Sequence, residues 1–196
     1  MNLVDRAKNI IVSPKTEWEV VAGEEPNIQQ IFVGYVIPLA IIPTVAVILG
    51  WGLIGMLGLK SFNYGLALGL VQLLNAIAGV FIAAFVIDAL APSFGSQKNL
   101  GRAVQLVAFS MTPAWLGGIL NIFPAIGWLG SLFGLYGFYI LYLGVTPLMK
   151  TPQDKSIGYI IISIIVMIVV YFVLAAILTA IMFAIFGFSA WYGARY

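Results

Sequence analysis

Three polar side chains stand within long apolar stretches, and they are the residues best placed to do chemistry. Asp88 is the carboxylate nearest to the interior of such a stretch. A carboxylate at the centre of a bilayer costs about 2.5–3.5 kcal/mol, so an acidic residue there suggests a substrate or coupling site. Asp88 also lies four residues before Pro92, where it could reach the headgroups or pair with Lys98 or Arg102. We favour the ion pair and keep the functional role as the alternative.

Gln72 and Asn75 are the other two members of this candidate intramembrane polar site. They are three residues apart, so they share one face of a helix. Amides in membrane helices usually hydrogen-bond to neighbouring helices. We favour this structural role over a polar patch for an ion or a lipid headgroup.

The sequence has no catalytic constellation. It contains neither Cys nor His, which removes thiol chemistry and the usual metal ligand and proton carrier. Paired carboxylates within one apolar stretch, phosphate loops and metalloprotease motifs are also absent. No basic run could follow a phosphate backbone. We therefore predict a protein that is not an enzyme, with no metal, no cofactor and no nucleic-acid partner.

The elements that carry these residues are predicted to be membrane helices. Hydrophobic residues make up 62% of the 196 residues and charged residues 8%, against about 45–50% and about 25% in ordinary globular chains. A helix needs about 20 apolar residues to cross a bilayer. The stretch 103–149 is too long for one helix, and Asn121, Pro124 and Gly127 mark a break in it. The predicted spans are about 31–58, 64–90, 103–122, 125–146 and 157–187.

Three prolines fall inside the predicted spans. Pro38 and Pro43 lie in the first span and Pro113 in the third. A proline removes one backbone hydrogen bond and kinks its helix. Kinks can act as gates, but they are also common packing devices in membrane helices, and we favour packing.

Small residues also recur four positions apart. This spacing lets two helices approach closely. The predicted close contacts involve the pairs Gly65 and Gly69, Gly79 and Ala83, and Gly130 and Gly134.

Residues 1–30 precede the transmembrane domain, residues 31–196, and contain an amphipathic helix. Leu3, Ala7 and Ile10 recur at helical spacing with charged residues between them. Such a helix lies in the headgroup region with its apolar face down. Trp18 is predicted to anchor this segment in the interface. The fold class is thus an all-α membrane protein, a bundle of five transmembrane helices with an N-terminal amphipathic interfacial helix.

Basic residues predict the orientation, because loops rich in Lys and Arg stay in the cytoplasm. With five spans, one side carries seven basic residues and the other carries two, which places the N-terminus in the cytoplasm and the C-terminus outside. The seven are Arg6, Lys8, Lys15, Lys98, Arg102, Lys150 and Lys155, and the two are Lys60 and Arg195.

Several local patterns together resemble small bacterial members of the Yip1 family. The segment Asn9-Ile-Ile-Val-Ser-Pro-Lys-Thr-Glu-Trp18 is similar to the family's amphipathic start. Thr112-Pro113, followed by Pro124, is similar to its third-helix region. The resemblance then continues through the fourth helix and the start of the fifth: Gly134-Leu-Tyr-Gly-Phe-Tyr-Ile-Leu-Tyr-Leu-Gly144, Leu148-Met-Lys-Thr-Pro152 and Lys155-x-x-Gly-Tyr159.

This resemblance implies a five-helix domain with a cytoplasmic N-terminus, in a bacterial inner (plasma) membrane. Eukaryotic relatives take part in vesicle trafficking and associate with small GTPases and with one another. The segment Asp88-Ala-Leu-Ala-Pro-Ser-Phe-Gly95 matches a eukaryotic motif only approximately, so GTPase binding and functional residues are not carried over.

The leading hypothesis is a non-enzymatic, Yip1-like multi-pass membrane protein that organises lipid components or partner membrane proteins. Its predicted partners are membrane lipids, other membrane proteins or further copies of itself. The alternative is a small transporter or channel for a lipid or an ion, in which the polar residues and the kinked first helix carry the function.

Overall fold

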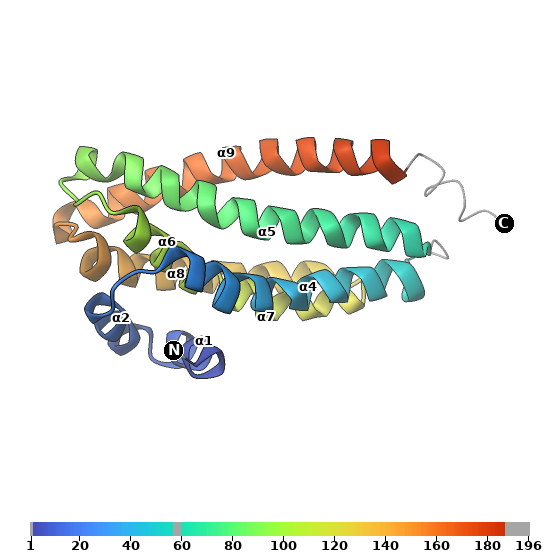
Figure 1. The fold of residues 1–196 in the computed structure, drawn as a ribbon, viewed down its shortest axis with the longest axis horizontal. Coiled ribbons are helices and arrows are strands. Elements are labelled where there is room, and N and C mark those ends of the chain that lie inside the picture. Colours follow the sequence, from blue (N-terminus) through green and yellow to red (C-terminus); the bar gives the residue numbers. More distant parts are fainter. Residues whose placement is uncertain (1, 57–59, 187–196) are drawn as a thin grey trace.

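The computed structural model describes residues 2–56 and 60–186. Within these ranges, five helices are long and apolar enough to cross a membrane, and they run up and down as one elongated bundle (Figure 1). The predicted fold class, an all-α bundle of five transmembrane helices, is confirmed. The spans are Ile28–Ile54, Phe62–Phe94, Leu100–Ile122, Gly127–Met149 and Gln153–Met182. The predicted span ends at 58 and 187 lie outside the described residues, as does Arg195.

The first span is an irregular helix. Its segments are α3 (Ile28–Ile31), the π-helical η1 (Phe32–Val36), α4 (Ile37–Leu49) and the π-helical η2 (Gly50–Ile54). In η1 the amide of Ile37 donates to the carbonyl of Phe32, five residues back, directly before Pro38. Such a widened turn is one of the recognised causes of a bend in a helix. Pro43 follows inside α4.

The second span is the long α5 (Phe62–Leu90), which continues into the 3-10 turn η3 (Ala91–Phe94). The third span is divided: Met111 alone separates α6 (Leu100–Ser110) from α7 (Thr112–Gly117), and Pro113 is the second residue of α7. A proline fits in the first turn of a helix, where no amide partner is needed.

A tight hairpin joins the third and fourth spans. The 3-10 segments η4 (Gly118–Ile122) and η5 (Gly127–Leu129) flank it, and α8 (Gly130–Met149) follows. Within η4 the side-chain amide of Asn121 donates to the carbonyl of Gly118 at 2.9 Å, and in the turn itself the backbone amide of Ile126 donates to the carbonyl of Phe123 at 3.0 Å. The fifth span belongs to α9 (Gln153–Phe186).

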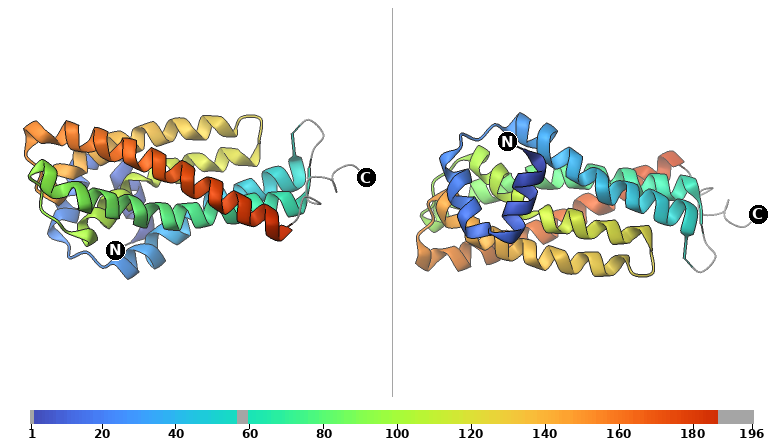
Figure 2. Two further views of the ribbon diagram at one scale, coloured as in Figure 1. Left: turned by 90° about the horizontal axis from the view of Figure 1, so that it is seen from above. Right: turned by 90° about the horizontal axis from the view of Figure 1, so that it is seen from below.

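The spans differ greatly in burial. In the most apolar 18-residue stretch of the third span, 72% is buried inside the bundle, whereas in that of the fifth span the share is 11%. The third span is therefore the core helix. α9 lies alongside α5 at the edge of the bundle (Figures 1 and 2) and exposes most of its surface.

Glycines set the closest helix contacts. A Cβ at Gly65 of α5 would lie 2.7 Å from the carbonyl oxygen of Ile48, and one at Gly137 of α8 would lie 2.6 Å from that of Ser110. Gly79 differs from these, because a Cβ added there meets nothing within 4 Å. The close contacts show why small residues stand at those positions, and the open space beside Gly79 belongs to the cavity described below.

The N-terminal helices and two loops gather at one end of the bundle. α1 (Leu3–Val12) and α2 (Pro14–Gly23) lie there, as do the turns after α5 and α8 (Figure 1). The two turns are joined by a hydrogen bond between the hydroxyls of Ser96 and Thr151 at 2.8 Å. The amide of Gln97 also donates to the carbonyl of Met149 at 2.8 Å. The segments that carry the seven basic residues thus share one end of the molecule.

Candidate functional site: a lateral cavity and a buried ionic cluster

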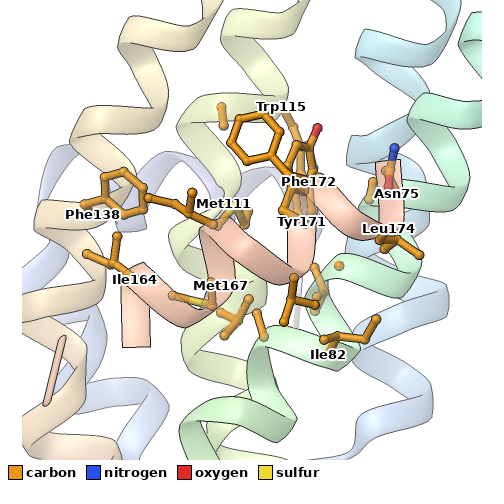
Figure 3. A pocket seen from close by; sticks show the side chains of 18 of the residues that line it. Asn75, Ile82, Met111, Trp115, Phe138, Ile164, Met167, Tyr171, Phe172 and Leu174 are labelled. Carbon is orange, nitrogen blue, oxygen red and sulfur yellow. The ribbon is translucent and has the colours of Figure 1, made fainter. Parts of the chain in front are cut away.

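A cavity of about 340 Å³ lies between α9 and the rest of the bundle. Its walls come from α5, from α6 and α7, from α8 and from α9, and they are lined mainly by apolar side chains (Figure 3). Phe172, one of the lining residues on α9, is 69% exposed, so the cavity extends to the lateral surface of the span. Its volume falls within the range of about 300–1,000 Å³ typical of ligand pockets.

Two of the three sequence-predicted polar residues line this cavity. Gln72 and Asn75 both contribute to its α5 wall. Asn75 is 5% exposed, and its Oδ1 atom is buried with no hydrogen-bond partner. The Asn75 oxygen therefore makes no hydrogen bond to a neighbouring helix, although such a bond was the favoured structural role.

The third predicted residue, Asp88, lies elsewhere. It is in the last turn of α5 and does not line the cavity. Its Oδ2 atom is 3.9 Å from Nζ of Lys98, at the end of the bundle that carries the basic residues, while its Oδ1 atom is buried without a partner. The structure thus brings Gln72 and Asn75 together and keeps Asp88 apart from them. Among the described residues, no three His, Cys, Asp or Glu side chains are grouped to hold a metal ion.

The prolines also lie outside the cavity lining. Pro43 packs against the third span: a Cβ added at Gly118 would lie 2.6 Å from the Cβ of Pro43. Pro113 is the second residue of α7, and the hydroxyl of Thr112, the first residue, lies 2.6 Å from the Tyr35 hydroxyl in a hydrogen bond. These contacts pack the proline-containing segments of the first and third spans against each other.

A buried ionic cluster beneath the N-terminal helices was missed by the sequence analysis. Arg6 of α1 is 4% exposed and forms ion pairs with Glu17 and Glu24. Its guanidinium carbon also lies 5.4 Å from the centre of the Phe109 ring on α6. The sequence held a signal for this position, because Arg6 lies three residues after Leu3 and four before Ile10 and so falls on the apolar stripe of its helix.

Trp18 packs into the core next to this cluster. The prediction that it anchors the segment in the interface is wrong, because the side chain is fully buried. Its indole donates to the carbonyl of Ile140 on α8 at 3.0 Å, and its ring lies 6.2 Å from that of Phe109. Gly144 of α8 leaves the necessary room, since a Cβ there would lie 2.5 Å from the indole. An internal carbonyl and an apolar slot replace the headgroup environment that an interfacial Trp uses.

Comparison with known proteins gives the family. The model of the Yip1 domain matches residues 8–177. The chain belongs to the Yip1 domain family. The predicted resemblance is thereby confirmed, and the match runs from α1 into α9.

Curated relatives agree on the location. The chain is 26% identical over 157 residues to inner membrane protein YohC of Escherichia coli K12, covering 74% of this chain and 80% of YohC. The same values hold for YohC of E. coli O6:H1, strain CFT073. No solved structure matches the chain. Together with the five apolar spans, this similarity makes the chain an integral inner membrane protein.

Proposed function

We propose that this Yip1-family protein is not an enzyme and organises membrane lipids by holding a lipid chain in its lateral cavity. The observation that carries the proposal is the cavity between α5 and α9, which is lined mainly by apolar side chains and reaches the lateral surface within the membrane spans. A lipid chain has the apolar surface that such walls match, and it can enter from the bilayer without crossing water.

A photoreactive lipid tests this proposal. A phospholipid with a diazirine in one acyl chain is expected to label the cavity-lining methionines, Met111 and Met167, in reconstituted protein. Gly79→Leu should reduce this labelling at least about fivefold, because its side chain would grow into the cavity space beside α5. Peptide mass spectrometry locates and quantifies the labelled sites.

Gly34→Leu is the matched control for this experiment. Gly34 is exposed on the first span, has no atom within 4 Å of an added Cβ, and does not line the cavity. Labelling of Gly34→Leu should equal that of the wild type. Labels spread evenly over the exposed surface of the bundle, unaffected by Gly79→Leu, would contradict the proposed function.

The transporter or channel alternative is favoured by one observation: Gln72 and Asn75 bring amide groups into an otherwise apolar cavity. Against it, Asp88 lies outside the lining. Flux assays in reconstituted vesicles distinguish the two functions. A flux that Asp88→Asn leaves unchanged would remove Asp88 from this alternative.

We further propose that the basic end of the bundle faces the cytoplasm. The N-terminal helices and the turns after α5 and α8 gather there, whereas Lys60 lies beyond the opposite end, just before α5. Loops rich in Lys and Arg are retained on the cytoplasmic side. Association with other membrane proteins or with a second copy stays a prediction.

The absence of Cys makes this orientation easy to measure. Lys15→Cys and Lys60→Cys each place one thiol on an exposed side chain, at opposite ends of the bundle. In spheroplasts, a membrane-impermeant maleimide is expected to label the cysteine at 60 and to spare the one at 15. After lysis both should react, which provides the control for thiol accessibility. The reverse pattern in intact spheroplasts would contradict the orientation.

A further inference from the structure

The buried amide oxygen of Asn75 lacks a partner in a place where a ligand could supply one. Four buried side-chain polar atoms among the described residues have no hydrogen-bond partner: Asn75 Oδ1, Asp88 Oδ1, Ser110 Oγ and Ser163 Oγ. Of these residues, Asn75 is the one that lines the cavity. Tyr171 and Trp115 also line it and carry donors (Figure 3), yet neither donates to this oxygen. A buried acceptor left unpaired is costly, so a donor brought by a ligand would be strongly favoured.

The depth of Asn75 restricts the ligand's polar group. Asn75 lies thirteen residues after Phe62 and fifteen before Leu90 in α5, about 20 Å and about 22 Å along the helix axis. A hydrocarbon core of about 30 Å centred on this helix would place Asn75 near its middle. A charged group is strongly disfavoured there, so a phosphate or carboxylate headgroup would not reach this site. The polar group that meets Asn75 is therefore small and uncharged.

The pair of amides restricts the ligand's polar group further. Gln72 and Asn75 line the same wall one helical turn apart. An amide side chain offers both donors and an acceptor, and a hydroxyl group both donates and accepts. A hydroxyl can therefore donate to Asn75 Oδ1 while it accepts from a neighbouring amide. A carbonyl or an ester group has no donor for the unpaired oxygen.

From these three points we infer that the cavity binds an uncharged lipid alcohol, with its apolar body against α9 and its hydroxyl donating to Asn75. This inference rests on the proposed function, because it names the lipid class that the cavity takes. It assigns Asn75 as the residue that selects a hydroxyl-bearing lipid over lipids of equal length without a donor.

Two matched probes test the inference: a long-chain alcohol with a diazirine in its chain, and the methyl ether of the same molecule. On wild-type protein in vesicles, half-saturation of cavity labelling should need about three- to tenfold less alcohol than ether, as expected for one neutral hydrogen bond. Asn75→Leu should remove this preference and leave the labelling by the ether unchanged. The comparison on wild-type protein stands even where Asn75→Leu does not fold.

The outcomes separate the two proposals. Equal labelling of the cavity by alcohol and ether in the wild type would overturn the assignment of Asn75 while leaving a lipid-holding function intact. Absence of cavity labelling by both probes and by the photoreactive phospholipid would overturn both. Crosslinks between two copies of the chain through α9, at the expense of probe labelling, would show that a second copy covers the cavity and would also overturn the inference.

Discussion

Replacing Arg6 by alanine is expected to destabilise the folded protein by about 3–5 kcal/mol, because it leaves a buried carboxylate without its cationic partner. Arg6 and Glu17 are both buried, and Glu24 binds the same guanidinium from the end of α2. The loss of Arg6 also removes the cation from the face of Phe109. Titration of purified protein with SDS in detergent micelles, followed by tryptophan fluorescence, measures the change in the free energy of unfolding.

Two further variants make this result specific. Lys8→Ala removes a charge from an exposed position of the same helix and should change stability by less than about 0.5 kcal/mol. Arg6→Met combined with Glu17→Gln removes both buried charges and should recover part of the loss, since the penalty comes from an unpaired ion. An Arg6→Ala protein that unfolds at the same SDS fraction as the wild type would show that the ion pair does not hold α1 to the bundle.

The transmembrane helices could be predicted from the sequence because the bilayer imposes a simple condition on them. A span must be apolar over about 20 residues and must satisfy its own backbone. The break near Asn121 was visible for the same reason, since no membrane is thick enough for a helix over 103–149. Hydropathy does not predict which span is buried inside the bundle. The third span is the core helix and α9 lies at the edge, although α9 is the more hydrophobic of the two.

The N-terminal segment shows where this reasoning fails. Amphipathic periodicity identifies an apolar stripe, but a membrane surface and a protein surface attract that stripe equally well. Trp18 and Arg6 were assigned to the interface or its polar side, and the structure buries both against α6 and α8. Their true partners, Ile140 and Phe109, are distant in sequence, so no local pattern could name them.

The candidate site was predicted only in part. Helical spacing placed Gln72 and Asn75 on one face, and both line the cavity. Spacing could not reveal that α9 leaves a space opposite that face, because the position of α9 depends on its packing against α5. Asp88 was grouped with the two amides only because it is also polar. It lies at the end of α5, about four helical turns away from Asn75.

Replacing Trp18 by alanine is expected to cost about 3–5 kcal/mol, as large aromatic deletions in cores do. The indole is fully buried between Phe109 and Gly144 and donates to the carbonyl of Ile140. Its removal would leave a cavity at the point where α2 meets α8. The same SDS titration gives the free energy, and trypsin cleavage after Lys15 reports separately whether α1 and α2 have left the bundle.

Two controls separate the contributions of Trp18. Trp18→Phe keeps most of the apolar volume but loses the N–H donor, so about 1–3 kcal/mol of the loss should remain. Trp128 is 65% exposed near the hairpin at the opposite end, and Trp128→Ala should leave both the free energy and the cleavage at Lys15 close to wild type. If Trp18→Ala were as stable and as resistant to trypsin as Trp128→Ala, the docking of the N-terminal helices would have to depend on other contacts. If Arg6→Ala and Trp18→Ala both allow trypsin to cleave after Lys15, the ionic cluster and the indole hold the same two helices. The losses in the free energy of unfolding should then be less than additive in the double variant.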